Sequence, residues 1–286
     1  MKYLYLVFLI LLAVTGSSTA QNDITTGPIK GQLLLIGGNA EDSLYLPMFM
    51  DLAGGPDASV VIIPSARSEQ VISQNFSDQQ VQRFQQFGFK NVSILHTRCK
   101  KKANTEAFVD PLKNADAVWI MGGRQWRLVD AYQNTLTHLE LVGLLHRGGV
   151  IAGTSAGATI QGSYLVRGDT EKNTIMMGDH EKSFSFIKNC AVDQHLLARN
   201  RHFDLFEVLQ EHPELLGIGL DENTGILVDG DTFRVVGESY VAIYDGTRWS
   251  EERDTIYELK DQEHQFYFLK AGDRYNMKLR SVILDE

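Results

Sequence analysis

The chain has 286 residues, with 27 Lys and Arg against 36 Asp and Glu and a formal net charge of -9. Hydrophobic residues make up 43% and charged residues 22%, a globular composition that excludes a disordered or collagen-like chain. The negative charge disfavours binding to nucleic acid or to an anionic membrane surface, so an anionic substrate would need a local cluster of arginines.

Residues 1–20 have the pattern of a secretory signal peptide. A single cation, Lys2, precedes an apolar run over 3–14, and small residues end at Ala20. The apolar run is short for a bilayer span and no stop-transfer pattern follows, which disfavours the alternative of an uncleaved membrane anchor. We expect cleavage after Ala20 and a secreted or periplasmic protein that has no membrane contact afterwards.

The chain contains two cysteines, Cys99 and Cys190. An oxidising compartment would permit a bridge between them, but the sequence leaves their pairing open. Neither has a Cys or His at a recognised ligand spacing, so we predict no metal and no cofactor.

Short apolar runs alternate with helical segments in the first half of the chain. Strands are predicted at 32–37, 59–64, 92–96, 115–121 and 149–153, and helices at 78–87 and 135–147. This alternation is typical of an α/β fold, with a mostly parallel sheet and helices on both faces. In such folds, functional side chains gather at the carboxyl ends of the strands.

The second half of the chain has a different pattern of predicted elements. A helix is predicted over 193–209, followed by short strands at 217–220, 224–228, 232–236 and 240–244. Because no repeat or Pro- or Ser-rich linker interrupts the pattern, we expect a single domain over 21–286 with a β-rich C-terminal part.

The segment 149–158 runs from a predicted strand into a Gly-x-Ser-x-Gly motif centred on Ser155. A nucleophile on a tight strand-to-helix turn needs small neighbours, because the backbone there is strained. The amide of Ala156 would then be free to stabilise an oxyanion. The alternative is a Gly-rich turn with a buried serine.

A second loop, 120–128, contains Gly122, Gly123 and Gln125 after the preceding strand. Paired glycines let the backbone approach a ligand, so the Gly123 amide is a candidate second oxyanion donor and Gln125 a candidate substrate-binding residue. The alternative is a plain strand-to-helix turn.

His195 is the candidate general base, because polar residues surround it. On the predicted helix, His195 and Arg199 share a face at spacing i, i+4. A cation there favours the neutral imidazole that a base requires, and Arg199 would also reach an anionic group of a substrate.

The imidazole needs an orienting carboxylate. Asp221 and Glu222 end a short predicted strand, and neighbouring residues point to opposite faces, so only one of them can face His195. We favour Glu222, with Glu171 as an alternative acid.

Several of these segments together resemble the cyanophycinase and aspartyl dipeptidase family of serine exopeptidases, and the cyanophycinase branch most of all. The matching segments are 34–38, 122–125, 153–157, 193–201 and 217–222. The resemblance implies a fold related to class I glutamine amidotransferases, which is flavodoxin-like. It also implies a triad of Ser155, His195 and Glu222.

The resemblance further implies hydrolysis next to an aspartyl residue, as in β-aspartyl or cyanophycin-like peptides, with a peptide as the partner. It places Gln125, Asp193, Arg199 and Arg201 at positions associated with substrate contacts. Leu197 stands where a small hydroxyl residue is usual. Asp204 stands where an arginine is expected, and an acid there would weaken binding of a carboxylate.

Two other functions are alternatives to a serine exopeptidase. An α/β-hydrolase-type esterase would use a late histidine such as His264, although the HGGG-type loop of that fold is missing. A catalytically silent binding protein would keep the fold without the reaction. The sequence leaves the oligomeric state open, a homodimer included.

Overall fold

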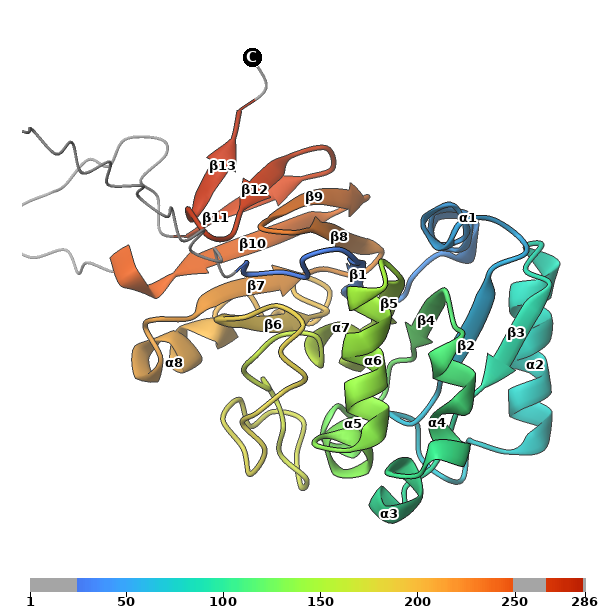
Figure 1. Cartoon of the computed structure of the whole chain (residues 1–286). Helices are drawn as coiled ribbons and strands as arrows, with labels where there is room; N and C mark the ends of the chain where they lie inside the picture. The colour runs from blue at the N-terminus through green and yellow to red at the C-terminus, as the bar shows by residue number, and fades with distance from the viewer. Residues whose placement is uncertain (1–24, 249–265, 285–286) are drawn as a thin grey trace, which may run out of the picture.

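Two β-sheets build the molecule, as seen in a computed structural model that describes residues 25–248 and 266–284. The larger sheet has nine strands in the order β13-β12-β9-β8-β1-β5-β4-β2-β3, and the smaller has four in the order β11-β10-β7-β6. In Figure 1 the helix-covered half lies at the right and the β-rich half at the left. The expected signal peptide and His264 lie outside the described residues.

Five strands of the larger sheet run parallel, which confirms the strands predicted for the first half. All except the edge strand at 91–94 are mostly apolar and almost wholly buried, as expected for strands that helices cover on both sides. The edge strand alternates exposed and half-buried residues. The bounds of the five strands are β1 (Gln32–Ile36), β2 (Ser59–Ile63), β3 (Asn91–Ile94), β4 (Ala117–Ile120) and β5 (Val150–Thr154).

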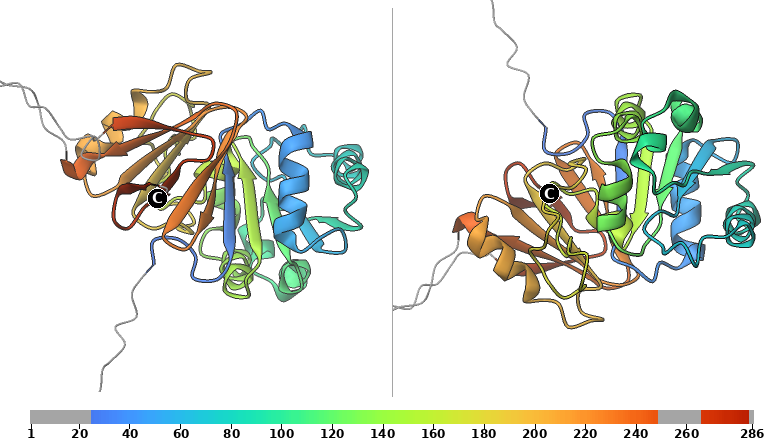
Figure 2. Two further views of the ribbon diagram at one scale, coloured as in Figure 1. Left: turned by 90° about the horizontal axis from the view of Figure 1, so that it is seen from above. Right: turned by 90° about the horizontal axis from the view of Figure 1, so that it is seen from below.

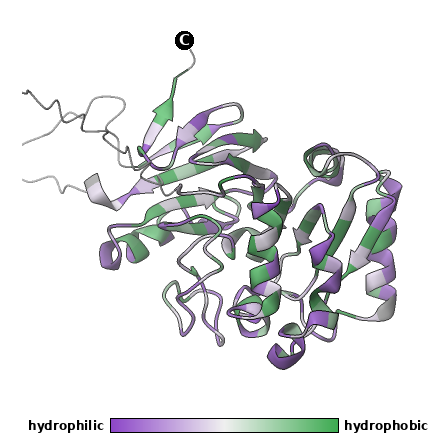
Figure 3. Ribbon diagram, viewed as in Figure 1, coloured by the Kyte–Doolittle hydropathy of each residue, from purple (hydrophilic) through white to green (hydrophobic). Residues whose placement is uncertain are grey.

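Helices cover both faces of this parallel part, as predicted (Figure 2). One face packs on α1 (Asp42–Ala53) and α2 (Gln74–Gln86), through residues such as Phe49 and Phe84. The other face packs on α3 (Lys100–Ala103), α4 (Glu106–Lys113), α5 (Trp126–Tyr132) and α6 (Leu136–His146). Figure 3 shows apolar residues on both the strands and the covering helices. Among the described residues, no helix is long and apolar enough to cross a membrane.

The remaining strands form the β-rich part. β8 pairs antiparallel with β1 and extends the larger sheet, while β6 and β7 begin the smaller one, whose side chains share one apolar core with β8 and β9. The bounds are β6 (Cys190–Gln194), β7 (Leu216–Leu220), β8 (Thr224–Asp229), β9 (Thr232–Gly237), β10 (Tyr240–Asp245), β11 (Phe266–Lys270), β12 (Arg274–Asn276) and β13 (Ser281–Ile283), with a 3₁₀ turn at Gly246–Arg248.

The predicted helix over 193–209 is wrong. Residues up to Gln194 belong to β6, which pairs in parallel with β7, and the chain then turns before α8 (Asp204–Glu211) begins. His195 has a φ of 57°, in the left-handed region, which ends the strand and excludes a helix. Pairing with β7 outweighs the local helical pattern here.

Cys99 and Cys190 are both free thiols, the first exposed and the second buried. The bridge that the sequence left open does not form in this structure.

Candidate active site

Ser155 stands on the sharp turn between β5 and the short helix α7 (Ala156–Thr159). Its φ of 53° lies in the left-handed region, a strained position for a residue with a side chain. The two glycines of the motif permit the turn by close packing. A β-carbon on Gly153 would lie 2.0 Å from the Gly157 carbonyl oxygen, and one on Gly157 would lie 2.1 Å from that of Ile120.

The imidazole of His195 reaches Ser155 from the end of β6. Ser155 Oγ and His195 Nε2 are 2.9 Å apart, within hydrogen-bonding distance. The backbone of His195 is held by its own N–H, which donates to the Gly37 carbonyl oxygen at 3.0 Å. Three separate segments, after β1, β5 and β6, therefore meet at the carboxyl edge of the parallel strands.

Glu222 faces the other imidazole nitrogen, with 2.6 Å between its Oε1 and His195 Nδ1. Asp221 points elsewhere: its Oδ1 accepts from the N–H groups of Leu197 and Ala198, and its Oδ2 accepts from the Ser239 hydroxyl. Glu171, the alternative acid, lies exposed on a loop. The structure thus brings Glu222 to His195, and neither Asp221 nor Glu171.

Burial lowers the pKa of His195 below its ordinary value, and the nearby charges of Arg199 and Arg201 act in the same direction. The hydrogen bond and charge of Glu222 oppose them by raising the pKa. The net effect keeps the imidazole neutral around pH 7, the form that can accept a proton from a hydroxyl.

The glycine loop after β4 approaches Ser155 closely. A β-carbon on Gly122 would lie 3.1 Å from Ser155 Cβ, and one on Gly123 would lie 2.2 Å from the Ala66 carbonyl oxygen. Ala156 begins α7, so its N–H has no acceptor within the helix. Gln125 follows in the same loop, is 1% exposed, and donates from Nε2 to the Val166 carbonyl oxygen at 2.7 Å. Its Oε1 has no hydrogen-bond partner among the described residues.

The three charged residues expected to contact the substrate differ in solvent exposure. Asp193 is fully buried, and Arg201, 8% exposed, donates to Gln194. Arg199 is exposed and forms no ion pair with any residue that the structure describes. Only Arg199 is therefore both charged and open to a ligand.

The two departures from the family pattern have different surroundings. The side chain of Leu197 is 38% exposed, on the turn after His195. Asp204 forms an ion pair with Arg167, which also binds Asp193. The acid at 204 is therefore neutralised within the protein, which removes the repulsion of a substrate carboxylate that the sequence led us to expect.

Sequence reasoning missed two residues of this site. Gly38 lies against the imidazole of His195, and Arg167 joins the buried Asp193 to the partly exposed Asp204. Gly38 belongs to the glycine pair after the first strand, so its place at a strand end was a usable signal. Arg167 had none, because its partners are 26 and 37 residues away in the sequence.

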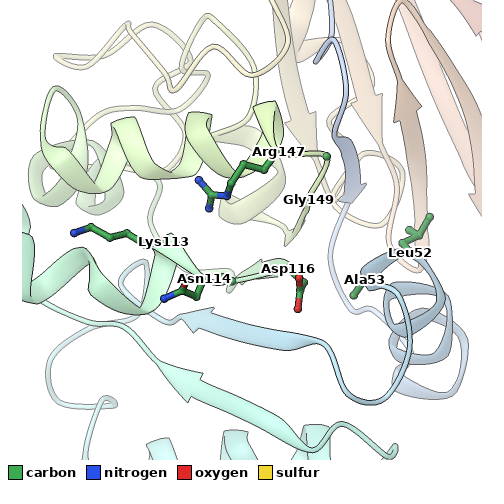
Figure 4. Close-up of a pocket in the computed structure, with 9 residues that line it drawn as sticks. Leu52, Ala53, Lys113, Asn114, Asp116, Arg147 and Gly149 are labelled. Carbon is green, nitrogen blue, oxygen red and sulfur yellow. The ribbon is translucent and has the colours of Figure 1, made fainter.

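A crevice of about 290 Å³ at the other end of the parallel strands is unrelated to this site (Figure 4). It is lined by residues just before β4 and β5, such as Asp116 and Gly149, whereas Ser155 follows β5. Within the described part of the chain, no cluster of three or more His, Cys, Asp or Glu side chains could hold a metal ion.

Comparison with known proteins points to one family. Residues 33–236, more than half of the chain, match the model of peptidase family S51. A cyanophycinase from Geminocystis herdmanii is 32% identical over 262 residues, which cover 87% of this chain and 95% of that protein. A cyanophycinase from a Nostoc species is 30% identical over 274 residues, covering 89% of this chain and 88% of that one.

A solved structure shares the fold. The crystal structure of a peptidase from an acI-B1 Actinobacterium superposes with a TM-score of 0.63 at 21% identity, covering 88% of this chain and 98% of that one. This likeness confirms the flavodoxin-like α/β fold. With the family match and the sequence identity to the cyanophycinases, it leads to one conclusion: the chain belongs to peptidase family S51 and is a serine-type peptidase.

Proposed function

We propose that this peptidase is an exported exopeptidase that hydrolyses aspartyl peptide bonds, of the β-aspartyl or cyanophycin-like kind, through Ser155, His195 and Glu222. The observation that carries the proposal is the continuous row from Ser155 Oγ to His195 Nε2 at 2.9 Å and from His195 Nδ1 to Glu222 Oε1 at 2.6 Å. The names of the cyanophycinases among its relatives and the signal-like residues 1–20 support the substrate class and the export.

In the proposed reaction, Ser155 Oγ attacks the carbonyl carbon of the aspartyl amide while its proton passes to His195 Nε2. Glu222 holds the imidazole by Nδ1–H and stabilises the imidazolium that forms. The N–H groups of Ala156 and Gly123 donate to the oxyanion. His195 then gives its proton to the leaving nitrogen, the C–N bond breaks, and water releases the acyl group by the same route in reverse.

Arg199 is the group that we assign to a carboxylate of the substrate. It is exposed and lies near enough to lower the pKa of His195 by its charge. The unpaired Oε1 of Gln125, an acceptor, suits an N–H group of the same substrate. Asp193 and Arg201 act in this proposal from within the protein, by holding the residues around them.

The test compares wild type with Ser155→Ala on dipeptides with α- and β-linked aspartate and on cyanophycin. We expect hydrolysis of an aspartyl linkage by wild type and its loss in the variant. Activity unchanged by the substitution would refute the mechanism. A fluorophosphonate probe separates the alternatives: labelling of Ser155 in folded protein excludes a silent binding protein, and ester turnover that depends on His264 rather than His195 would favour the esterase.

A further inference from the structure

The guanidinium of Arg167 fills an acidic pocket. Its Nε donates to Asp193 Oδ1 at 3.0 Å and its Nη2 to Asp193 Oδ2 at 3.1 Å, a bidentate pair. Nη2 also donates to Asp204, and Nη1 donates to the Asn173 carbonyl oxygen at 3.0 Å. All three nitrogens of the group are thus bound within the protein.

Arg167 occupies an unfavourable position, which its ion pairs with Asp193 and Asp204 must stabilise. The residue is 2% exposed and has a φ of 55°, a left-handed conformation that is unfavourable for an arginine. Burial alone would lower the pKa of Arg167, but Asp193 and Asp204 outweigh it and raise the pKa. The ion pairs therefore offset both the backbone strain and the cost of burying the charge.

The acidic pocket lies directly behind the candidate substrate side of the site. Asp193 lies on β6, two positions before His195 in the sequence, and Val166, the neighbour of Arg167, accepts the hydrogen bond from Gln125. The carboxylate of Asp204 is 34% exposed, although that of Asp193 is 0% exposed. Without the Arg167 side chain, the pocket would therefore open to solvent through Asp204.

The charge balance depends on Arg167. Without it, the described cation left beside Asp193 is Arg201, whose Nη1 is 4.0 Å from Asp193 and which also feels the charge of Asp204. Two carboxylates that already bind one guanidinium, Asp193 in a bidentate manner, would attract an arginine side chain from outside. With Arg167 in place, both carboxylates already bind a guanidinium.

We propose that Arg167 determines specificity by filling the Asp193–Asp204 pocket with the protein's own guanidinium, so that an arginine on the substrate finds no carboxylate there. The enzyme then does not favour an arginine next to the aspartyl bond over an uncharged residue of the same shape. This inference rests on the proposed function for its substrate, and on the Arg167 contacts for its site.

The kinetic test compares aspartyl-arginine with aspartyl-citrulline, which differ in charge but hardly in shape. In Arg167→Met, we expect the ratio of kcat/KM for the arginine to the citrulline substrate to rise by about tenfold, as for one charge-assisted hydrogen bond of about 1.4 kcal/mol. Arg167→Lys keeps the charge and should keep the wild-type ratio. A folded Arg167→Met enzyme with the wild-type ratio, or a Lys variant that shifts equally, would overturn the proposal.

A second measurement needs no activity. In the Ser155→Ala background, methylguanidinium should raise the melting temperature when Arg167→Met is also present and should leave it unchanged when Arg167 is intact, with sodium chloride at equal concentration as the control. If Arg167→Met does not fold, Arg167→Met with Asp204→Asn, which leaves one buried acid, replaces it. Methylguanidinium should then raise the melting temperature of this double variant and leave that of Asp204→Asn alone unchanged.

Failure of this inference and failure of the proposed function give different results. No shift with methylguanidinium overturns the inference even if the enzyme cleaves aspartyl peptides. A shift in a protein that cleaves none refutes the proposed function and keeps the pocket.

Discussion

The Cα atom of Gly38 lies against the ring of His195, so closely that a β-carbon on residue 38 would stand 2.1 Å from His195 Cε1 and 2.6 Å from Nδ1. The φ of Gly38 is 130°, which L-residues rarely adopt. The turn after β1 therefore packs directly against the imidazole and limits where the ring can lie. Its neighbour Gly37 holds the His195 backbone through its carbonyl oxygen.

We predict that Gly38→Ala leaves the protein folded but lowers kcat/KM by about 100-fold or more. The added methyl group must push the imidazole away from Ser155 Oγ, and a misplacement of about 1 Å is enough for a loss of this size. Kinetics on the aspartyl dipeptide that wild type cleaves best, with circular dichroism for folding, measure the effect.

Gly54→Ala is the matched control. Gly54 also has a positive φ, 97°, but a β-carbon there meets no atom within 4 Å. Both variants place a β-carbon at a positive φ, so a loss of activity confined to Gly38→Ala locates its cause at the imidazole. Equal activities of the two variants would contradict the steric argument.

The sequence predicted most of the fold because the parallel strands are short apolar runs with clear boundaries. The Gly-x-Ser-x-Gly segment also has a local cause, since only glycine permits the contacts of Gly153 and Gly157 with neighbouring carbonyl groups. Position along the chain then put Ser155 and Glu222 at strand ends, where the structure brings them to His195.

The segment after Asp193 shows where such reasoning fails. Residues 196–200 have good helix propensity, yet they form a turn, because Asp221 binds the N–H groups of Leu197 and Ala198 and β6 pairs with β7. Nothing local in the sequence indicates these distant partners. The pairing of Asp204 with Arg167 is hidden for the same reason, so its charge was predicted to face a ligand.

The pH dependence of the reaction should follow the charges around His195. Because the neutral imidazole is the base in the proposed reaction, kcat/KM should rise with pH through the His195 pKa, which lies below its ordinary value. Arg199 lowers that pKa, so Arg199→Met should move the acid limb of the profile to higher pH. Arg83→Met, on α2, replaces an arginine that is not among the charges acting on His195 and should leave the limb in place.

Glu222→Gln should move the same limb in the opposite direction, because Glu222 raises the pKa of His195. It should also lower kcat on the order of 10³-fold or more, since the amide neither fixes the tautomer nor stabilises the imidazolium. Profiles of kcat/KM between pH 4 and 8 measure both effects. Shifts of the limb in the same direction for Arg199→Met and Glu222→Gln would contradict this account of the site.

Asp221 should act as a positioning residue for the turn that carries Leu197 and Arg199. Asp221→Ala removes the acceptor for two backbone N–H groups and for the Ser239 hydroxyl, which should cost about 1–3 kcal/mol of unfolding free energy and raise KM. Asp221→Asn keeps an acceptor at Oδ1 and should lose less of both. Urea unfolding and steady-state kinetics check the order, and an Asn variant as impaired as the Ala variant would assign the effect to charge instead.

Gly123→Ala should lower kcat by about 10²- to 10³-fold, the usual effect of losing one oxyanion donor. The φ of Gly123 is 153°, and a β-carbon would lie 2.2 Å from the Ala66 carbonyl oxygen, so the loop must shift relative to Ala66 and displace the Gly123 N–H. The Ser155–His195–Glu222 row does not involve this loop, so the pH at the midpoint of the acid limb should stay where it is in wild type.

Gly55→Ala, with a positive φ and no atom within 4 Å of the added β-carbon, is the control. A Gly123→Ala enzyme with wild-type kcat would remove the Gly123 amide from the mechanism, and one with a displaced acid limb would mean that the loop also supports His195.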